Sequence, residues 1–198
     1  FPPATKSTKI LHYFPQSTYS QFYTDEFGWS DAEWLLGEWN GPAAIKGVVR
    51  PEDAKKAIDT GFSTVWVSNH GARQSETSPA TIDVLPSIRE AVGPDVEVIM
   101  DGGAQRGTDI AKALALGADS VGVGKPYLWG LAAGGEAGVN RAYEILKVEL
   151  DRAMGLLGTG TVADLKREGP SLIKRRGGSA RDYPDRFAHE RGYGGGIV

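Results

Sequence analysis

Residues 65–74 read VWVSNHGARQ, a short apolar run that stops abruptly on a polar cluster. The run from Val65 to Val67 is typical of a buried strand, and the polar residues after it mark the carboxyl end of that strand. One of the three histidines of the chain, His70, lies there, and Arg73 follows three residues later. The stretch therefore predicts a buried strand that carries polar side chains at its carboxyl end.

The same order of a short apolar run and then a helix repeats along the middle of the chain. We predict strands at 43–48, 64–67, 96–100 and 120–123, and helices at 51–61, 82–92, 108–116 and 140–157, after a shorter helix that begins near Ser30. This alternation is typical of a parallel sheet with right-handed crossovers, so the predicted fold class is α/β. Four units are half of a TIM barrel, but an open doubly wound sheet shares the pattern. The pattern alone leaves both architectures open.

The composition excludes several classes of function. The 198 residues are 40% hydrophobic and 24% charged, which suits one ordinary globular domain. A net charge of -3 gives no positive field for nucleic acid, and the absence of cysteine excludes disulfides and thiolate metal sites. No apolar run approaches the roughly 20 residues that span a bilayer. We predict a cytoplasmic protein with no metal and no nucleic-acid partner.

The two ends of the chain differ from its middle. Residues 1–27 are rich in Ser, Thr, Tyr and Pro and are predicted to form a loop, for which a lid is favoured over membrane contact. Residues 166–198 are polar and rich in glycine, which predicts an extended arm. The α/β domain is therefore placed at residues 28–165.

Polar residues and glycines follow all four predicted strands, where functional groups of parallel α/β proteins gather. Two consecutive ends, 101–107 and 122–125, combine glycines with cations, which suits a phosphate because glycine lets backbone N–H groups approach an anion. The alternative is that these glycines only form turns and that Lys125 is a surface charge. Because glycines and cations occur together at two consecutive strand ends, a phosphate site is favoured over simple turns.

His70 can act as a base or as a structural residue, and Arg73 can grip a carboxylate with its two-pronged guanidinium. Their place at a strand end favours a functional role. Lys46 lies within an apolar strand, and a buried ammonium requires an anion nearby. That anion is either a ligand or a carboxylate of the protein, and both remain open.

These residues belong to longer motifs. The motifs are Ile45-Lys46-Gly47, Ser68-Asn69-His70-Gly71-Ala72-Arg73-Gln74, Asp101-Gly102-Gly103 with Arg106-Gly107-Thr108-Asp109, Lys112 to Ala118, and Gly122 to Leu128. Over residues 28–165 the chain resembles the FMN-dependent 2-hydroxy acid oxidase and dehydrogenase family, which includes glycolate oxidase, lactate dehydrogenase and mandelate dehydrogenase. The resemblance implies the second half of a TIM barrel, strands five to eight. Phe1-Pro2-Pro3 then resembles the loop after strand four, and a first half is expected as a separate piece.

The resemblance also implies roles for single residues. His70 would be the base that takes a proton from the substrate, Arg73 would hold the substrate carboxylate, and Lys46 would lie beside flavin N1 and O2. Ser68 would contact the flavin. The ribityl phosphate of FMN would be surrounded by Asp101, Gly102, Gly103, Gln105, Gly124 and Lys125.

Three departures from the family pattern stand out. Ala72 replaces a second glycine, Ser75-Glu76 replaces Leu-Asp, and Gln105 and Lys125 replace arginines. The loss of charge at Gln105 predicts weaker FMN binding unless Arg106 compensates.

The function implied by the resemblance is FMN-dependent oxidation of an L-2-hydroxy acid to a 2-oxo acid, in a homo-oligomer, with a tetramer suggested. Two alternatives remain from the residues. One is another phosphate-binding TIM-barrel enzyme, and the other is a noncatalytic half-barrel subunit of a flavoprotein.

Overall fold

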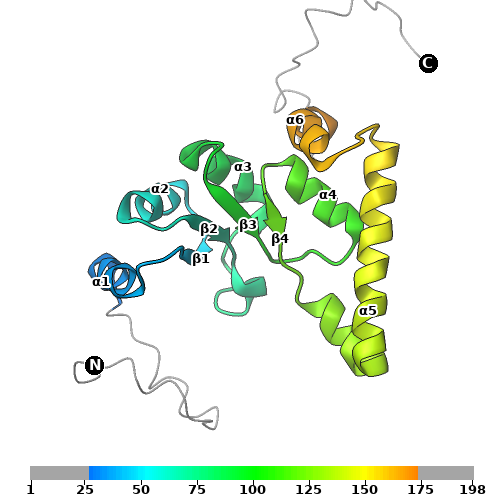
Figure 1. Cartoon of the computed structure of the whole chain (residues 1–198), viewed down its shortest axis with the longest axis horizontal. Coiled ribbons are helices and arrows are strands. Elements are labelled where there is room, and N and C mark those ends of the chain that lie inside the picture. The colour runs from blue at the N-terminus through cyan, green and yellow to red at the C-terminus, as the bar shows by residue number, and fades with distance from the viewer. Residues whose placement is uncertain (1–26, 174–198) are drawn as a thin grey trace, which may run out of the picture. The chain divides into compact units, whose positions relative to one another are not determined.

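The computed structural model describes residues 27–173, and contacts divide the chain into two units between Gly41 and Pro42 (Figure 1). The described part of the first unit is helix α1 (Trp29–Trp39), which confirms the helix predicted near Ser30. The predicted loop at 1–27 lies almost wholly outside the described residues.

The second unit alternates strands and helices. Its elements are β1 (Ala44–Val48), α2 (Pro51–Thr60), β2 (Thr64–Val67), the 3₁₀ turn η3 (His70–Ala72), α3 (Thr81–Val92), β3 (Glu97–Met100), α4 (Gly107–Ala115), β4 (Ser120–Val121), α5 (Lys125–Leu156) and α6 (Val162–Leu172). The four strands form one sheet in the order β1-β2-β3-β4, and every neighbouring pair is parallel. The predicted α/β class is confirmed, although β4 is shorter than the predicted strand.

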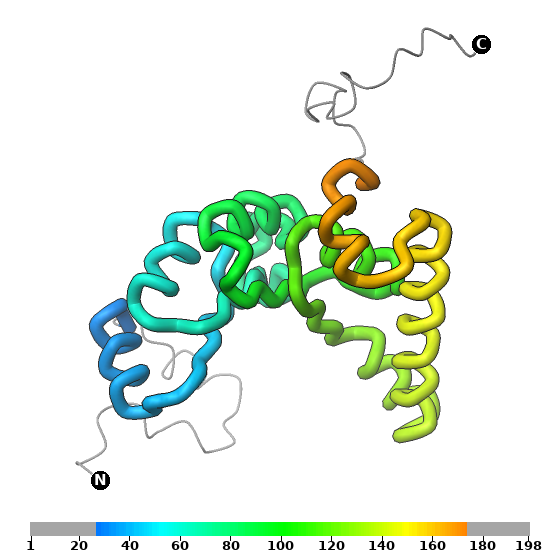
Figure 2. Tube along the Cα trace, turned by 45° about the horizontal axis from the view of Figure 1, so that its top comes forward, coloured from blue at the N-terminus to red at the C-terminus, as the bar shows by residue number. Residues whose placement is uncertain are grey.

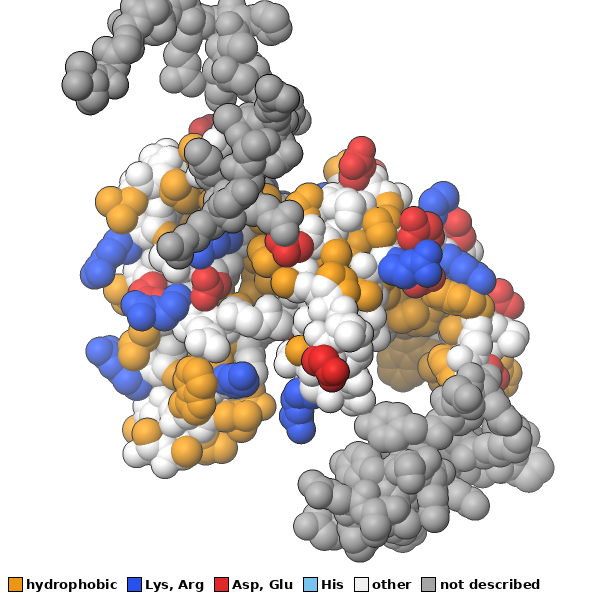
Figure 3. Space-filling model, turned by 180° about the vertical axis from the view of Figure 1, so that it is seen from behind, with side chains coloured by type: hydrophobic (Ala, Val, Ile, Leu, Met, Phe, Trp, Pro, Cys, Tyr) orange, Lys and Arg blue, Asp and Glu red, His pale blue; other side chains and the backbone are white. Residues whose placement is uncertain are grey.

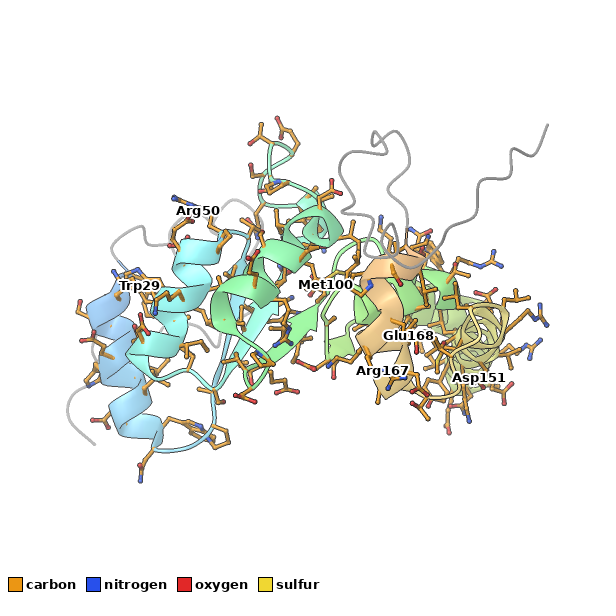
Figure 4. All side chains as sticks on the ribbon, turned by 90° about the horizontal axis from the view of Figure 1, so that it is seen from above. Trp29, Arg50, Met100, Asp151, Arg167 and Glu168 are labelled. Carbon is orange, nitrogen blue, oxygen red and sulfur yellow. The ribbon has the colours of Figure 1, made fainter. Side chains whose placement is uncertain are left out.

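The two faces of the sheet differ in character. Val65, Val67, Val98 and Met100 are buried on one face, where they pack with residues of α2, α3 and α4 in a single hydrophobic core. Figure 4 shows Met100 near the centre of this arrangement. Side chains alternate along a strand, so the residues between these four point to the opposite face.

That opposite face is polar and aromatic. Lys46 on β1 stands in register with Trp66 on β2, which in turn is in register with Ile99 on β3. Thr64 on the same face donates a 2.8 Å hydrogen bond to Glu97 of the next strand. A parallel sheet with helices on one face and mixed side chains on the other is what part of a TIM barrel looks like, because the second face lines the barrel interior.

Helix α5 begins earlier than the sequence predicted. The prediction placed a helix at 140–157, whereas α5 starts at Lys125 and reverses at Gly134 and Gly135, whose backbone angles are not helical. Figure 2 shows the two arms, 125–133 and 136–156, as a hairpin. The arms cross where Gly130 meets Gly138, and a Cβ on either would collide with the carbonyl of the other. Four glycines lower the helix propensity of 125–139, which explains the missed arm.

Helix α6 corrects the predicted arm at 166–198. Residues 166–172 are helical, and the remainder of the arm from residue 174 lies outside the described residues. Thr161 and Asp164 form a capping box, and Leu165 is fully buried in a cluster with residues of α4. The charged pair Arg167 and Glu168 lies on the outside of α6 (Figure 4).

Among the described residues, no helix combines the length and the apolar character that crossing a membrane requires.

Candidate active site

The side chain of Asp101 links residues at the carboxyl ends of three strands. The Asp101 side chain, after β3, lies 3.0 Å from the ammonium of Lys46 on β1 and accepts a 2.6 Å hydrogen bond from the Ser68 hydroxyl after β2. The same hydroxyl oxygen accepts a 3.1 Å hydrogen bond from the backbone N–H of His70. Lys46 was predicted to be buried, but its side chain is 42% exposed, so burial does not force the pairing. It does pair with a carboxylate of the protein, and its exposure leaves it open to a ligand as well.

Trp66 lies beneath this ion pair on the same face of the sheet. The Lys46 ammonium stands 5.1 Å from the centroid of its ring, a favourable cation–π distance. The indole N–H of Trp66 is buried and has no hydrogen-bond acceptor among the described residues. A buried donor without an acceptor is costly, so an acceptor supplied from outside the described residues would stabilise this face.

The loop that carries His70 and Arg73 has an unusual backbone. His70, Gly71 and Ala72 have φ values of 54°, 67° and 60°, in the left-handed region. The side chain of Asn69 fixes the turn, because its carbonyl oxygen accepts hydrogen bonds from the N–H groups of residues 71 and 72 and its amide donates to the Pro79 carbonyl.

The side chains of His70 and Arg73 are engaged by no protein group among the described residues. Both residues are exposed, and within residues 27–173 neither side chain has a hydrogen bond or ion pair. An imidazole and a guanidinium that no protein group engages are available to a ligand.

The two glycine turns also lie at this edge of the sheet. Thr81 donates a 2.6 Å hydrogen bond to the Asp101 carbonyl, and a Cβ on Gly102 would lie 3.0 Å from the Asn69 side-chain oxygen, so this part of the turn is tightly packed. Gly103 and Gly124 instead face open space.

Gly124 is informative because neither its backbone nor its packing requires glycine. Its φ is -107°, which any residue adopts, and a Cβ there would contact nothing. A glycine that the protein does not need for itself leaves room for a ligand to approach the backbone. Lys125, which follows it, is exposed and has no ion-pair partner among the described residues. These features fit a bound phosphate.

Arg106 does not join this cluster. Its guanidinium forms a two-pronged pair with the carboxylate of Glu149 on α5, at 2.9 Å and 2.6 Å. The hydrogen bond from Arg106, followed by that from the Gly107 N–H, holds the pKa of Glu149 below its usual value. In this structure Arg106 is therefore engaged by Glu149 and not by the edge that carries Gly103 and Gly124. Glu149 is 43 residues away in sequence, and no local pattern could have indicated it.

Gln105 lines a different part of the surface. It borders a groove of about 340 Å³ between the arms of α5, together with Trp129 and Arg141. Its backbone N–H is bound by the carboxylate of Asp109, which caps α4. Nothing in this arrangement directs Gln105 toward a phosphate, so its predicted role rests on the resemblance alone.

The fold and this edge define a parallel α/β protein whose polar groups gather at the carboxyl ends of its strands, beside two open glycine turns. The chain belongs to the FMN-dependent dehydrogenase family, whose pattern matches residues 4–172. The resemblance inferred from the sequence is confirmed, and so is the assignment to part of a TIM barrel.

Relatives with different names are similar to this chain. Pre-mycofactocin synthase of Mycolicibacterium smegmatis is 49% identical over 71% of the chain and 35% of that protein. Human 2-hydroxyacid oxidase 1 is 52% identical over 74% of the chain and 41% of that protein. A solved mandelate oxidase with benzoyl-formic acid has a TM-score of 0.69 and 40% identity, covering 71% of this chain and 42% of that one. The chain thus spans less than half the length of these relatives.

Proposed function

We propose that this chain supplies the FMN-binding and catalytic edge of an enzyme that oxidises an L-2-hydroxy acid to a 2-oxo acid. The observation that carries the proposal is the convergence, at one edge of the sheet, of the Lys46–Asp101–Ser68 cluster with the unpaired His70 and Arg73. Membership of the FMN-dependent dehydrogenase family supports it. Two relatives named as oxidases of 2-hydroxyacids and mandelate support the substrate class.

The roles follow from the chemistry of each group. Gly103, Gly124 and Lys125 would hold the phosphate of FMN, and Lys46, Ser68 and Asp101 would lie beside its flavin. FMN, when bound, accepts the two electrons that leave the substrate. Within this arrangement the chain needs a cation for the substrate carboxylate and a base for its proton.

Arg73 and His70 meet those two needs. Arg73 would grip the carboxylate through two parallel hydrogen bonds, which also fixes the orientation of the hydroxyl-bearing carbon. His70 would accept one proton from the substrate as its electrons leave. The Asn69 clamp on the turn and the Ser68 bond to the His70 N–H would keep the imidazole at the strand end.

An N-terminal half of the barrel, packed against this chain, is also part of the proposal. The indole N–H of Trp66 lacks an acceptor among the described residues, and α5 exposes large apolar side chains, among them Leu131, Tyr143, Val148 and Leu156. Figure 3, with α5 on its left, shows hydrophobic side chains among the charged ones on this surface. Exposed apolar area of this kind marks an interaction surface. We assign it to an N-terminal half of the barrel, and a cytoplasmic homotetramer remains a prediction.

The visible spectrum of the purified protein tests the proposal. We expect flavin bands that bleach without oxygen when a 2-hydroxy acid such as lactate, glycolate or mandelate is added. His70→Gln should keep the flavin and lose the bleaching. Flavin that no 2-hydroxy acid reduces would point to a substrate of another class, such as that of the pre-mycofactocin synthases. A colourless protein would contradict the proposal, and the mass of the native assembly would show whether another half-barrel accompanies the chain.

A further inference from the structure

Glu149 reaches from the second arm of α5 to the start of α4 and uses both of its oxygens there. Oε1 lies 2.6 Å from Nη2 of Arg106, and Oε2 accepts hydrogen bonds of 2.9 Å from Nε of Arg106 and from the N–H of Gly107. The Glu149 side chain is 17% exposed, whereas that of Arg106 is 70% exposed. Glu149 is thus the more enclosed member of the pair, and it holds the exposed side chain of Arg106 in place.

This contact fixes the position of the helix start. A Cβ on Gly107 would collide with the backbone of Leu146 and Leu150, so the backbones of α4 and α5 touch at this point. The turn at 101–105 directly precedes it, and its other end is held by the hydrogen bond from Thr81 to the Asp101 carbonyl. Gly103, between the two fixed ends, faces open space.

The hydrogen bonds at the start of α4 also limit where an anion can bind. The N–H groups of Gln105 and Arg106 donate to the carboxylate of Asp109, and that of Gly107 donates to Glu149. A helix N-terminus normally attracts phosphate, but here two carboxylates occupy its donors. The remaining sites at this edge are the open turns at Gly103 and Gly124, with the charge of Lys125.

We propose that Glu149 is a positioning residue for the phosphate of FMN. Its role is to hold the turn at 101–105 in shape through its bonds to Arg106 and to the N–H of Gly107. This inference rests on the proposed function, because it presumes that FMN binds at this edge. It gives the two cations different roles: Arg106 anchors the loop, and Lys125 binds the phosphate.

The test compares FMN with riboflavin, which carries the same ring system but no phosphate. The protein in its native assembly, its Glu149→Gln variant and a Glu144→Gln control are titrated with each flavin by fluorescence quenching. Glu144 lies on the same helix and pairs with Arg141 at 3.4 Å in an exposed position, so its change should leave both affinities unaltered. Glu149→Gln should weaken FMN binding by about tenfold, the scale of coupling within a shared ion-pair network, and riboflavin binding by less than about twofold.

Arg106→Gln is the second variant, because it leaves the bond between Glu149 and the Gly107 N–H in place. It should produce a smaller selective loss, and the double variant should lose no more than Glu149→Gln alone. Equal weakening of FMN and riboflavin would show a general structural role and overturn the inference. Tighter FMN binding in Glu149→Gln would also overturn it, because a freed Arg106 would then be a phosphate ligand. A wild-type protein that binds neither flavin would refute the proposed function itself.

Discussion

The ammonium of Lys46 and the carboxylate of Asp101 lie 3.0 Å apart although their strands, β1 and β3, are not neighbours in the sheet. The pair spans β2 above the ring of Trp66, which lies in register with Lys46. In TIM barrels the interior layers are built from side chains of alternate strands, and this bridge over an intervening strand has that character. The same contact therefore links the carboxyl ends of β1 and β3 and leaves the Lys46 side chain partly exposed.

Asp101→Asn should lower the free energy of unfolding by about 1–2 kcal/mol, because the charge-assisted hydrogen bond from Ser68 and the pairing with Lys46 are both weakened. Urea denaturation measures the loss. Asp59→Asn is the matched control, since its pair with Lys55 is exposed on α2 and should contribute almost nothing. Equal effects of the two substitutions would mean that Asp101 does not hold the strand ends together.

Ala72→Gly should stabilise the protein by roughly 0.5–1 kcal/mol, because Ala72 has a φ of 60° and a side chain in the left-handed region is strained. Thermal unfolding detects the gain. Ala142→Gly, within the second arm of α5, should instead destabilise by about 1 kcal/mol, as glycine does in a helix. A loss of stability in Ala72→Gly would show that the alanine methyl makes contacts that outweigh the strain.

Gly124→Ala should change the free energy of unfolding by less than about 0.5 kcal/mol, because a Cβ there meets nothing and the backbone suits any residue. It should nevertheless weaken FMN binding, since the methyl group would enter the space assigned to the phosphate.

Gly107→Ala provides the contrast to Gly124→Ala. Its Cβ would collide with the backbone of α5, so we expect a loss of more than about 2 kcal/mol in stability. Flavin titration alongside chemical denaturation separates the two effects. An unchanged FMN affinity in Gly124→Ala would remove this turn from the phosphate site.

The pattern of strands and helices predicted the sheet well. Each strand is short and apolar, and the helix after it ends at a glycine or a turn. The pattern failed at α5, where the first arm owes its place to the crossing of Gly130 and Gly138, a tertiary contact that overrides poor helix propensity. It failed again at α6, although the capping box of Thr161 and Asp164 was a local signal that could have been used.

The sequence predicted those site residues that lie directly at the carboxyl ends of strands. Lys46, Ser68 and Asp101 come together because the carboxyl ends of parallel strands share an edge. The partner of Arg106 was not predictable, because ion pairs between distant helices leave no spacing in the sequence. The pairing of Lys46 with a protein carboxylate was one of two options left open, and it depends on the registers of β1 with β2 and of β2 with β3.

Asp119 provides a pH-dependent part of the stability, at the opposite end of the strands from the candidate site. Its carboxylate accepts hydrogen bonds from Arg89, Lys166 and the N–H of Val98, so it ties α3 and α6 to the sheet. Partial burial opposes the charged form, but the bonds from Lys166 and Val98 and the charge of Arg89 outweigh it and hold the pKa below the ordinary 3.8.

A depressed folded-state pKa means that the unfolded chain binds the proton more readily, so Asp119 stabilises the fold above about pH 4 and loses this contribution as the pH falls through its folded pKa. Asp119→Asn should therefore cost about 2 kcal/mol at pH 7 and progressively less below pH 4. Urea denaturation at a series of pH values measures the difference between variant and wild type. A difference that stayed constant from pH 7 to pH 3 would show that the cost arises from altered packing around Arg89 and Lys166, whereas a difference that shrinks with acid is the signature of the carboxylate charge.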